Sequence, residues 1–501
     1  MGTASSTDER SSTLQDCSSP RRAASLLSTV LAPVTVVLFG LALRLYKLNQ
    51  ESVGFDEAFS MAACRDTLAG MFRTLIEDFV HPPLHYLALR GWLDVFGSGV
   101  VQARVLSVLF GTLAIAMLYV LVNYLLDRHS ALLASLLLAV SQLSIQFAQE
   151  ARPYAQFLFL FLACSYVFIR ALHARSLKLW CGFVWLAILL IYTHYFGLLV
   201  LGALMVFAFF YRREYPIPAL WWIGGAAVLI LAYLPWLTSG IVPAATHSGR
   251  TFSGRNSFWS VNASTFFGAV NFFNNGKPTG VFDTSPSWTF AAGGLLFVLP
   301  AAYGLWASKR GAQRQNLVLA ALLWILPLLG AIAAGLMHFQ YNVRYVAFCA
   351  APYYVLVGFG LSRIRPALVR ALMVVLLLGY TANSLRANYF MPRKEGFRAA
   401  GNYITQNLQP GDCGVFFPGM TQQPQWNIEH PNLLRILGPQ EFDAGLTACR
   451  RIWSISWSLS GNPWQLEKAR TERQPLEAAQ SLVSEKRFFW VRVALFARKQ
   501  P

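Results

Sequence analysis

Two adjacent carboxylates, Asp56 and Glu57, stand among apolar and aromatic residues shortly after the first long apolar run of the chain. A carboxylate that is partly buried near a membrane surface can have a raised pKa, and it can then serve as a general base for a hydroxyl group. The competing interpretation is structural, because acidic residues in the first turn of a helix complement the helix dipole. The pair alone does not decide between a catalytic base and a helix start.

Histidines form the second group, in the sequence His81-Pro82-Pro83-Leu84-His85-Tyr86. Two prolines suit the first turn of a helix, which predicts a helix from Leu84 onward. His81 and His85 are four residues apart, as in helical metal sites, but a metal ion would need a carboxylate ligand from elsewhere. The alternative is that both histidines make polar contacts to the head group of a ligand.

Two arginines stand in very short segments between apolar runs, Arg152 beside Glu150 and Arg344 beside Tyr345. The planar guanidinium, with its fork of N–H donors, suits a phosphate group. Arg152 could instead pair with Glu150, where a surface pair contributes little, and Arg344 could anchor the interface beside its tyrosine. The other short segments on the same side of the membrane carry few basic residues. Both arginines therefore suit a ligand whose phosphate lies at the bilayer surface and whose tail lies among the helices.

The rest of the chain must position these residues. Of 501 residues, 55% are hydrophobic and 13% are charged, and the mean hydropathy is +0.44, whereas soluble domains carry about 25% charged residues. Apolar runs of about 18 or more residues recur, enough to cross a hydrocarbon core as helices. We therefore expect an all-α polytopic membrane protein with about eleven transmembrane helices. The expected spans are 25–46, 101–126, 131–148, 156–172, 179–194, 196–211, 218–238, 288–307, 317–337, 345–361 and 370–386.

The same pattern divides the chain into three parts. Residues 1–24 are polar and predict a disordered cytoplasmic tail. Residues 25–387 form the membrane domain, in which two long outer loops fall at 48–100, with amphipathic character, and at 239–287. Residues 388–501 have an ordinary mixed composition, and their length suits a small α/β domain outside the membrane.

The C-terminal part leaves two alternatives open. Cys413 and Cys449 could pair if this part faces an oxidising compartment, or they could stay free thiols. Trp453, Trp457 and Trp464 could bind carbohydrate, which would make this part the functional module, or they could lie in its core.

Loop charge predicts the orientation. The formal net charge is +18, but the basic residues cluster in alternate short loops, which is typical of the cytoplasmic side of a cell-membrane protein and not of a nucleic-acid interface. The N-terminus is then expected inside, and both long loops and the C-terminal domain outside. The basic residues on the expected inner side are Arg128, Arg175, Lys178, Arg212, Arg213, Lys309, Arg310, Arg314, Arg363, Arg365 and Arg370.

Acidic residues are missing from the middle of every expected span. Intramembrane ionisable residues mark ion pathways and proton relays, so their absence argues against an ion-coupled transporter. The candidate residues gather instead on the outer face, which favours an enzyme. A non-catalytic flippase or exporter of lipid-linked glycans is the alternative.

Five sequence blocks occur in the same order as in a known family. They are Phe55-Asp56-Glu57-Ala58, then His81-Pro82-Pro83-Leu84-His85-Tyr86, then Trp92 with Phe96-Gly97, then Arg104–Gly111, and last Gln149-Glu150-Ala151-Arg152-Pro153-Tyr154. In these blocks and in topology the chain resembles the bacterial protein-mannosyltransferase-like, or ArnT-like, glycosyltransferases of the GT-C fold. The resemblance is close over residues 40–175 and looser to about 390, where Arg344-Tyr345 resembles a late Arg-Tyr pair of the family. The C-terminal tail does not share it.

The resemblance implies an inverting glycosyltransferase that takes a sugar from a polyprenyl-phosphate donor to a hydroxyl group of a lipid, glycan or protein acceptor. It also implies roles for individual residues. Asp56 would be the general base, Glu150 the second acid, Arg344, Arg152 and Tyr345 the donor-phosphate contacts, and His81, His85 and Tyr154 further substrate contacts. Some members bind a divalent metal ion, for which Glu57, His81 and His85 are the candidate ligands.

Overall fold

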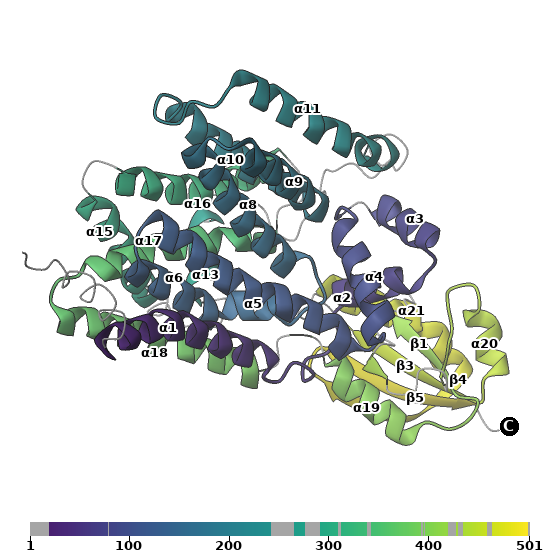
Figure 1. Ribbon diagram of the computed structural model, residues 1–501. Coiled ribbons are helices and arrows are strands. Elements are labelled where there is room, and N and C mark those ends of the chain that lie inside the picture. Colours follow the sequence, from purple (N-terminus) through teal and green to yellow (C-terminus); the bar gives the residue numbers. More distant parts are fainter. Residues whose placement is uncertain are drawn as a thin grey trace, which may run out of the picture.

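The computed structural model combines a bundle of apolar helices with a small α/β domain that lies beside the short helices α2 to α4 (Figure 1). It describes residues 20–78, 80–241, 265–275, 291–308, 312–337, 342–391, 394, 396–418, 427–428, 434–457 and 463–498. Most of the expected N-terminal tail and most of the expected loop 239–287 lie outside these ranges.

The bundle is built from helices in which apolar residues predominate, and these helices pack around the buried helix α17. Its helices are α1 (Pro20–Leu45), α5 (Val100–Leu125), α6 (Arg128–Val140), α7 (Gln142–Ala148), α8 (Tyr154–Ala174), α9 (Leu177–Thr193), α10 (Gly197–Phe210), α11 (Ala219–Trp236), α13 (Thr265–Asn275), α15 (Leu299–Ala307), α16 (Ala312–Leu336), α17 (Ala350–Arg363) and α18 (Ala367–Phe390), with short irregular turns η1 (Leu237–Ile241), η2 (Gly294–Val298) and η3 (Val343–Cys349). Glycine at position 360 lets α17 touch α15, because a β-carbon there would collide with the Pro300 carbonyl.

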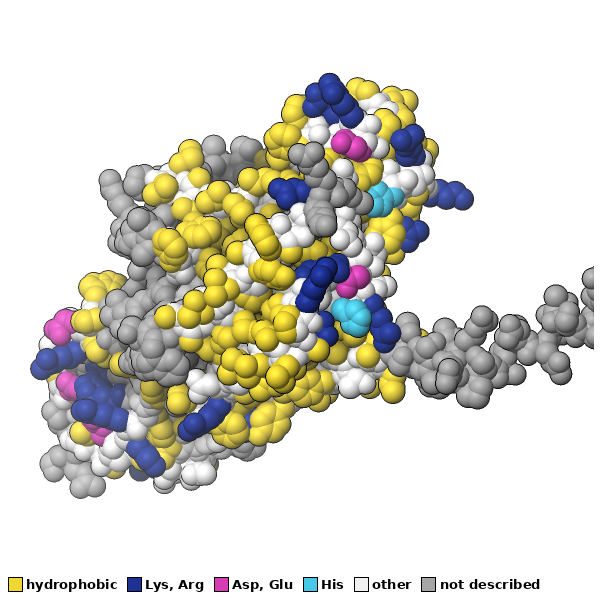
Figure 2. Space-filling model, turned by 90° about the vertical axis from the view of Figure 1, so that its left-hand side faces the viewer, with side chains coloured by type: hydrophobic (Ala, Val, Ile, Leu, Met, Phe, Trp, Pro, Cys, Tyr) yellow, Lys and Arg dark blue, Asp and Glu magenta, His cyan; other side chains and the backbone are white. Residues whose placement is uncertain are grey.

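Six described helices are long and apolar enough to cross a membrane, or seven if the bent pair α6–α7 counts as one span. Four shorter apolar helices accompany them: Val30–Leu45, Leu177–Thr193, Gly197–Phe210 and Ala291–Ala307. Each expected span overlaps one of these segments, but the count of eleven spans is not confirmed. Large hydrophobic side chains such as Leu220 and Ile223 of α11 are exposed, and hydrophobic side chains predominate on the face shown in Figure 2. Both observations fit a surface that meets lipid.

A buried arginine donates hydrogen bonds at the bend between α6 and α7. The two helices meet at 60°, and the break leaves carbonyl groups at the end of α6 without helical partners. Arg44 of α1, fully buried, donates from Nη1 to the Ala139 carbonyl at 3.2 Å and from Nη2 to the Ser144 hydroxyl at 2.7 Å. The break therefore supplies acceptors for a cation inside an apolar bundle.

The outer segment 48–100 contains three short helices, α2 (Phe55–Arg65), α3 (Leu68–Asp78) and α4 (Leu84–Phe96). The predicted helix start at Leu84 is confirmed. The three helices share a small core with the turn before α8. This core includes Met61, Met71, Tyr86 and Ala151. This packing fixes α2, and with it Asp56, against the end of the bundle.

The C-terminal domain is α/β, as predicted. Its strands are β1 (Cys413–Phe417), β2 (Arg435–Ile436), β3 (Arg451–Trp457), β4 (Gln480–Phe488) and β5 (Val491–Arg498), and its helices are α19 (Phe397–Asn407), α20 (Phe442–Ala448) and α21 (Pro463–Ala479). The sheet order is β2-β1-β3-β5-β4, in which β1 is parallel to β2 and β3 while β5 is antiparallel to β3 and β4.

Both open alternatives for this domain are now decided. Cys413 and Cys449 form a disulfide. Trp453 is a core residue whose indole N–H donates to Asp412 at 2.8 Å, and Trp457 packs against Phe397. Only Trp464 of the three tryptophans is exposed. They therefore form no common carbohydrate surface.

The α/β domain also holds the segment that leads into α2. The side-chain amide of Asn427 accepts a hydrogen bond from the Val53 N–H at 2.8 Å and donates one to the Val53 carbonyl at 3.2 Å. The Arg398 N–H donates to the Ser52 hydroxyl at 3.1 Å. The tail and the outer segment thus form one continuous structure.

Candidate active site

Asp56 and Arg344 lie together at the centre of the candidate site. Asp56 stands in the first turn of α2, and Arg344 is in η3, where its backbone N–H donates to the side chain of Asn342. Nη1 of Arg344 is 3.2 Å from Oδ2 of Asp56, and the two side chains are 46% and 52% exposed. The fold therefore joins the predicted base and the predicted phosphate-binding cation across 288 positions of sequence.

Glu57 points the other way and is only 2% exposed. Its oxygens accept two parallel hydrogen bonds from Arg104, from Nε at 2.7 Å and from Nη2 at 2.8 Å, and a third from the Ala151 N–H at 3.2 Å. Burial by itself raises the pKa of this carboxyl, but the charges of Arg104 and Lys394 outweigh burial and hold the pKa at about 2. Glu57 is therefore an ionised structural residue.

Arg104 also organises the approach to Asp56. Its Nη1 donates to the Leu48 carbonyl at 2.8 Å and its Nη2 to the Ser52 carbonyl at 3.2 Å. The buried guanidinium of Arg104 thus holds both Glu57 and the segment 48–52 that precedes α2. No role was predicted for Arg104, although an arginine inside an apolar run is a signal that could have found it.

Lys394 is a further residue that sequence analysis missed. Its Nζ is 3.1 Å from Oε1 of Glu150 and 3.6 Å from Oε2 of Glu57. It comes from the connection between α18 and α19, and nothing in the local sequence marks it. The predicted second acid, Glu150, is therefore mostly buried and already paired.

Arg152 lies behind α2, 5% exposed. Its Nη1 donates to the Asp56 carbonyl at 3.0 Å and to the Ser60 hydroxyl at 3.1 Å, and its Nη2 contacts Nε2 of His81 at 2.8 Å. All these bonds are to protein groups. A phosphate would reach the terminal nitrogens of Arg152 only if some of these bonds were given up.

The predicted histidine pair is buried and uncharged. Burial, and then the charge of Arg152, lowers the pKa of His81 well below its ordinary value. Burial also lowers the pKa of His85 to about 4, although Nδ1 of His85 is hydrogen-bonded to Gln156 Oε1 at 3.0 Å. Both imidazoles are therefore neutral at physiological pH.

The candidate metal ligands Glu57, His81 and His85 do not converge. Within the described ranges, no three His, Cys, Asp or Glu side chains are grouped so that they could hold a metal ion. Glu57 is occupied by Arg104, and Nε2 of His81 faces the guanidinium of Arg152. A metal site would have to form around a different arrangement of these side chains.

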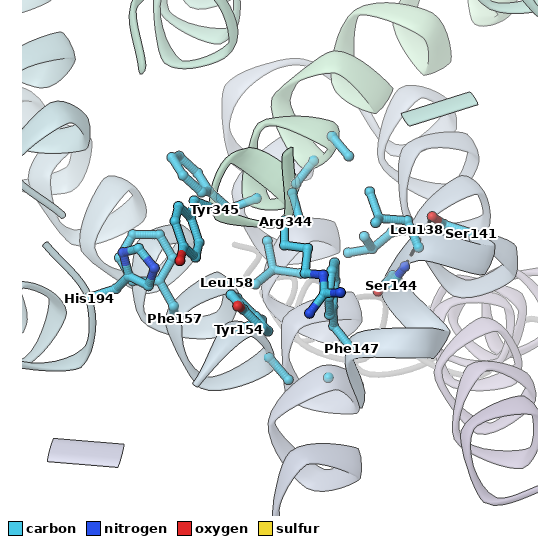
Figure 3. Close-up of a pocket in the computed structure, with 17 residues that line it drawn as sticks. Leu138, Ser141, Ser144, Phe147, Tyr154, Phe157, Leu158, His194, Arg344 and Tyr345 are labelled. Carbon is cyan, nitrogen blue, oxygen red and sulfur yellow. Dashed lines mark hydrogen bonds between the residues drawn. The ribbon is translucent and has the colours of Figure 1, made fainter. Parts of the chain in front are cut away.

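A pocket opens beside Arg344 (Figure 3), with about 510 Å³ of empty space including its solvent-open part. Arg344, Tyr345, Tyr154 and His194 contribute polar groups to its wall. The remaining lining is mainly apolar, from Leu138, Leu143, Phe147, Phe157, Leu158, Ala347, Phe348, Ala350 and Ala351. Such a pocket can take an apolar chain whose anionic end meets the guanidinium of Arg344.

Comparisons with known proteins identify the fold of the chain. The family model of dolichyl-phosphate-mannose-protein mannosyltransferases matches residues 80–238, and no curated protein matches the chain. Among solved structures, apo ArnT from Cupriavidus metallidurans is similar, with a TM-score of 0.59 and 13% identity over 95% of this chain and 98% of that one. The chain has a PMT/ArnT-like GT-C fold. The GT-C fold predicted from the sequence blocks is confirmed.

Two further structures share the GT-C fold and hold ligands. ArnT from Cupriavidus metallidurans bound to undecaprenyl phosphate has a TM-score of 0.57 and 13% identity, over 94% of this chain and 98% of that one. AglB, an oligosaccharyltransferase from Archaeoglobus fulgidus in complex with an inhibitory peptide and a dolichol-phosphate, has a TM-score of 0.54 and 13% identity, over 95% of this chain and 75% of that one.

Proposed function

We propose that this protein is a membrane glycosyltransferase that moves a sugar from a polyprenyl-phosphate donor to an acceptor hydroxyl group, with inversion at the anomeric carbon. The observation that carries the proposal is the half-exposed pair Asp56–Arg344 beside an apolar pocket. A base for the acceptor, a cation for the leaving phosphate and a groove for the lipid tail then lie within one site. The match to the mannosyltransferase family and the lipid phosphates bound to ArnT and AglB support the donor class.

The reaction follows from these positions. Donor phosphate enters beside Arg344 and draws its guanidinium away from Asp56, which frees the carboxylate. Asp56 then takes the proton of the acceptor hydroxyl while that oxygen forms a bond to the anomeric carbon. The bond between that carbon and the phosphate oxygen breaks, and its electron pair stays on the phosphate, where the N–H donors of Arg344 stabilise the growing charge.

The remaining predicted residues support this arrangement in different ways. Tyr345 and Tyr154 line the pocket and are proposed to contact the donor. His81 and His85 are proposed as further substrate contacts, and the ring of His81 lies 6.1 Å from that of Tyr154 between centroids. Arg152 binds the backbone of Asp56 and is proposed to position it. Glu150 is proposed to keep Lys394 in place or, once released, to orient the acceptor. The proposed acceptor is a hydroxyl group of a lipid, glycan or protein.

The same proposal includes a location. Loop charges put the N-terminus in the cytoplasm and the site on the outer side of the cell membrane. The disulfide between Cys413 and Cys449 supports this side, because disulfides persist in oxidising compartments. In this orientation the donor would be used after it has crossed the membrane.

The proposal can be tested with the full-length protein in lipid nanodiscs and undecaprenyl-phosphate mannose, glucose and other labelled sugars. We expect the wild type to release sugar from at least one donor, and Asp56→Asn to lose this activity at least about 100-fold. Asp94→Asn removes an exposed acid from α4 and should keep full activity. Transfer retained by Asp56→Asn would contradict the base assignment.

A flippase or exporter is distinguished with the same full-length protein in proteoliposomes. If proteoliposomes moved the lipid-linked sugar across the bilayer without breaking the sugar–phosphate bond, the transferase proposal would be wrong. Deleting the C-terminal domain is a poor discriminator, because the deletion would also remove Asn427 and Lys394, which hold the segment before Asp56 and the acids beside it.

A further inference from the structure

His194 has a hydrogen-bonding nitrogen that the proposed reaction does not use. It follows α9 directly, is 3% exposed and lines the pocket (Figure 3). Its Nδ1 accepts a hydrogen bond from the Phe196 N–H at 3.1 Å, so the neutral ring carries its proton on Nε2. That nitrogen is buried and has no hydrogen-bond partner.

His81 is in the same condition with the opposite tautomer. Arg152 can only donate, so Nε2 of His81 must accept, and the proton of the neutral ring lies on Nδ1. Nδ1 of His81 is also buried without a partner. The centroids of the two imidazoles are 5.0 Å apart. Two N–H donors without partners therefore lie side by side next to the pocket.

Two tyrosines complete a ring-lined box around these donors. Tyr345 is 5.6 Å from His194 and 6.2 Å from His81 between ring centroids, and Tyr154 is 6.3 Å and 6.1 Å from the same rings. We call these four residues the histidine–tyrosine box. Buried donors are costly when they are left unsatisfied, so the box is suited to a ligand that brings acceptor oxygens.

The tautomers of the two histidines also argue against some classes of ligand for the box. A metal ion needs a nitrogen lone pair, and both unpartnered nitrogens carry hydrogen. A cationic group is disfavoured as well, because Arg152, which touches His81, has no ion-pair partner in the described part of the chain while Arg104, Arg344 and Lys394 are each paired with an acid. The hydrogen bond from Arg152 further polarises the His81 ring and strengthens its Nδ1–H as a donor.

From this geometry we infer that the histidine–tyrosine box is the donor-sugar subsite, in which His81 and His194 donate hydrogen bonds to hydroxyl oxygens of an uncharged sugar ring. The inference rests on the proposed function, because it needs the donor phosphate at Arg344. Arg344 and His194 line the same pocket, and Figure 3 shows Arg344 between His194 and Tyr345 on one side and Leu138 and Ser144 on the other. A phosphate at Arg344 would then direct its sugar toward the box and its lipid tail toward the opposite, apolar side. The charge of Arg152 disfavours sugars that carry an amino group.

The experiment compares two lipids, undecaprenyl phosphate and undecaprenyl-phosphate mannose, bound to the full-length protein in nanodiscs. We expect His194→Ala to lower the affinity for the sugar-bearing lipid by about five- to tenfold, which is the value of one hydrogen bond. The sugar-free lipid should bind unchanged. His194→Gln, whose amide N–H reaches a similar position, should recover part of the loss, and His173→Ala, outside the pocket, should bind both lipids like the wild type.

Three results would overturn the inference. If His194→Ala lowered the affinity for both lipids equally, the box would bind phosphate oxygens. Unchanged binding of both would mean that it contacts no part of the donor. Tighter binding of a donor with a 4-amino sugar than of the mannose donor would contradict the exclusion of cations. If the wild type bound neither lipid, the proposed function itself would fail, whatever the variants do.

Discussion

Asp56 and Glu57 are neighbours in sequence and both face an arginine, yet the two pairs differ in almost every other respect. The Glu57–Arg104 pair is buried, with two hydrogen bonds of 2.7 and 2.8 Å and a third from the backbone. The Asp56–Arg344 pair makes one contact of 3.2 Å with both side chains half exposed. Consecutive residues on a helix point to different sides, so α2 sends one acid into the structure and the other toward the pocket.

The difference teaches which pair is able to take part in a reaction. A buried carboxylate whose oxygens are already satisfied can leave its partner only at a high cost in free energy. An exposed ion pair contributes about 0–1 kcal/mol, so a substrate phosphate can replace one of its members. In the proposed reaction the buried pair therefore serves as the support and the exposed pair as the reactive site.

The sharpest way to break this comparison is to remove each arginine in turn. Arg104→Met leaves the charge of Glu57 buried without its main partner and should lower the free energy of unfolding by about 3–5 kcal/mol. Arg344→Met should lower it by no more than about 1 kcal/mol. Thermal unfolding of the purified variants measures both.

Equal destabilisation by the two variants would contradict the division into support and site. The double variant Arg104→Met with Glu57→Met sharpens the test, since replacing both members of a buried pair is often nearly neutral. It should recover much of the stability that Arg104→Met loses.

A second prediction concerns donor binding. Arg344→Ala removes charge-assisted hydrogen bonds to the donor phosphate and should raise the KM for the donor by about 10- to 100-fold, since such bonds are worth about 1.5–3 kcal/mol. Arg365→Ala, on the expected inner side, is the matched control and should leave KM unchanged. A loss of kcat without a change in KM would show that Arg344 does not bind the donor in its ground state.

A third prediction concerns Lys394, which joins both buried acids to the C-terminal domain. Lys394→Met should lower kcat by about tenfold, because the segment that carries Asp56 becomes less well placed. Lys394→Arg should restore part of this loss. Lys468 is an exposed lysine of α21, so Lys468→Met should have no effect, and an equal loss there would point to general damage of the domain.

The smallest expected effect near neutral pH is the dependence of stability on pH. The folded-state pKa of Glu57 is about 2, below its ordinary value of 4.5, so its contribution to stability is complete above about pH 4.5 and is lost as the pH falls toward 2. Glu57 should therefore cause no change in melting temperature between pH 5 and 8. Below pH 4.5 the wild type should lose stability more steeply than Glu57→Gln, and parallel curves would contradict the pKa assignment.

Much of the fold could be predicted because it depends on local patterns. Apolar runs place the helices of the bundle, and the mixed composition after residue 388 indicates a separate α/β domain. The bend between α6 and α7 was missed because Ser141 caps a new helix inside one continuous apolar run, with no glycine or proline to mark the break.

The candidate site was predictable only in part. Asp56 and Arg344 were chosen for their chemical type, and the structure brings them together. Arg104 and Lys394 were missed because their importance comes from burial and from contacts between distant segments, which a single sequence does not show. His194 was given no role, since its unpartnered nitrogen is a property of the folded state alone.

The hydrogen bonds of Arg44 have a consequence for how the protein is assembled. Arg44 lies near the end of the first span, whereas its acceptor Ala139 follows 95 residues later. A membrane protein is inserted span by span, so α1 reaches the bilayer before the acceptors in α6 and α7 exist. Arg44 then has the Gly40 carbonyl of its own helix at hand, and its side chain can extend toward the interface. We therefore expect α1 to reach its final position only after α6 and α7 have been inserted. A variant that straightens the break at Ser141 should slow this step.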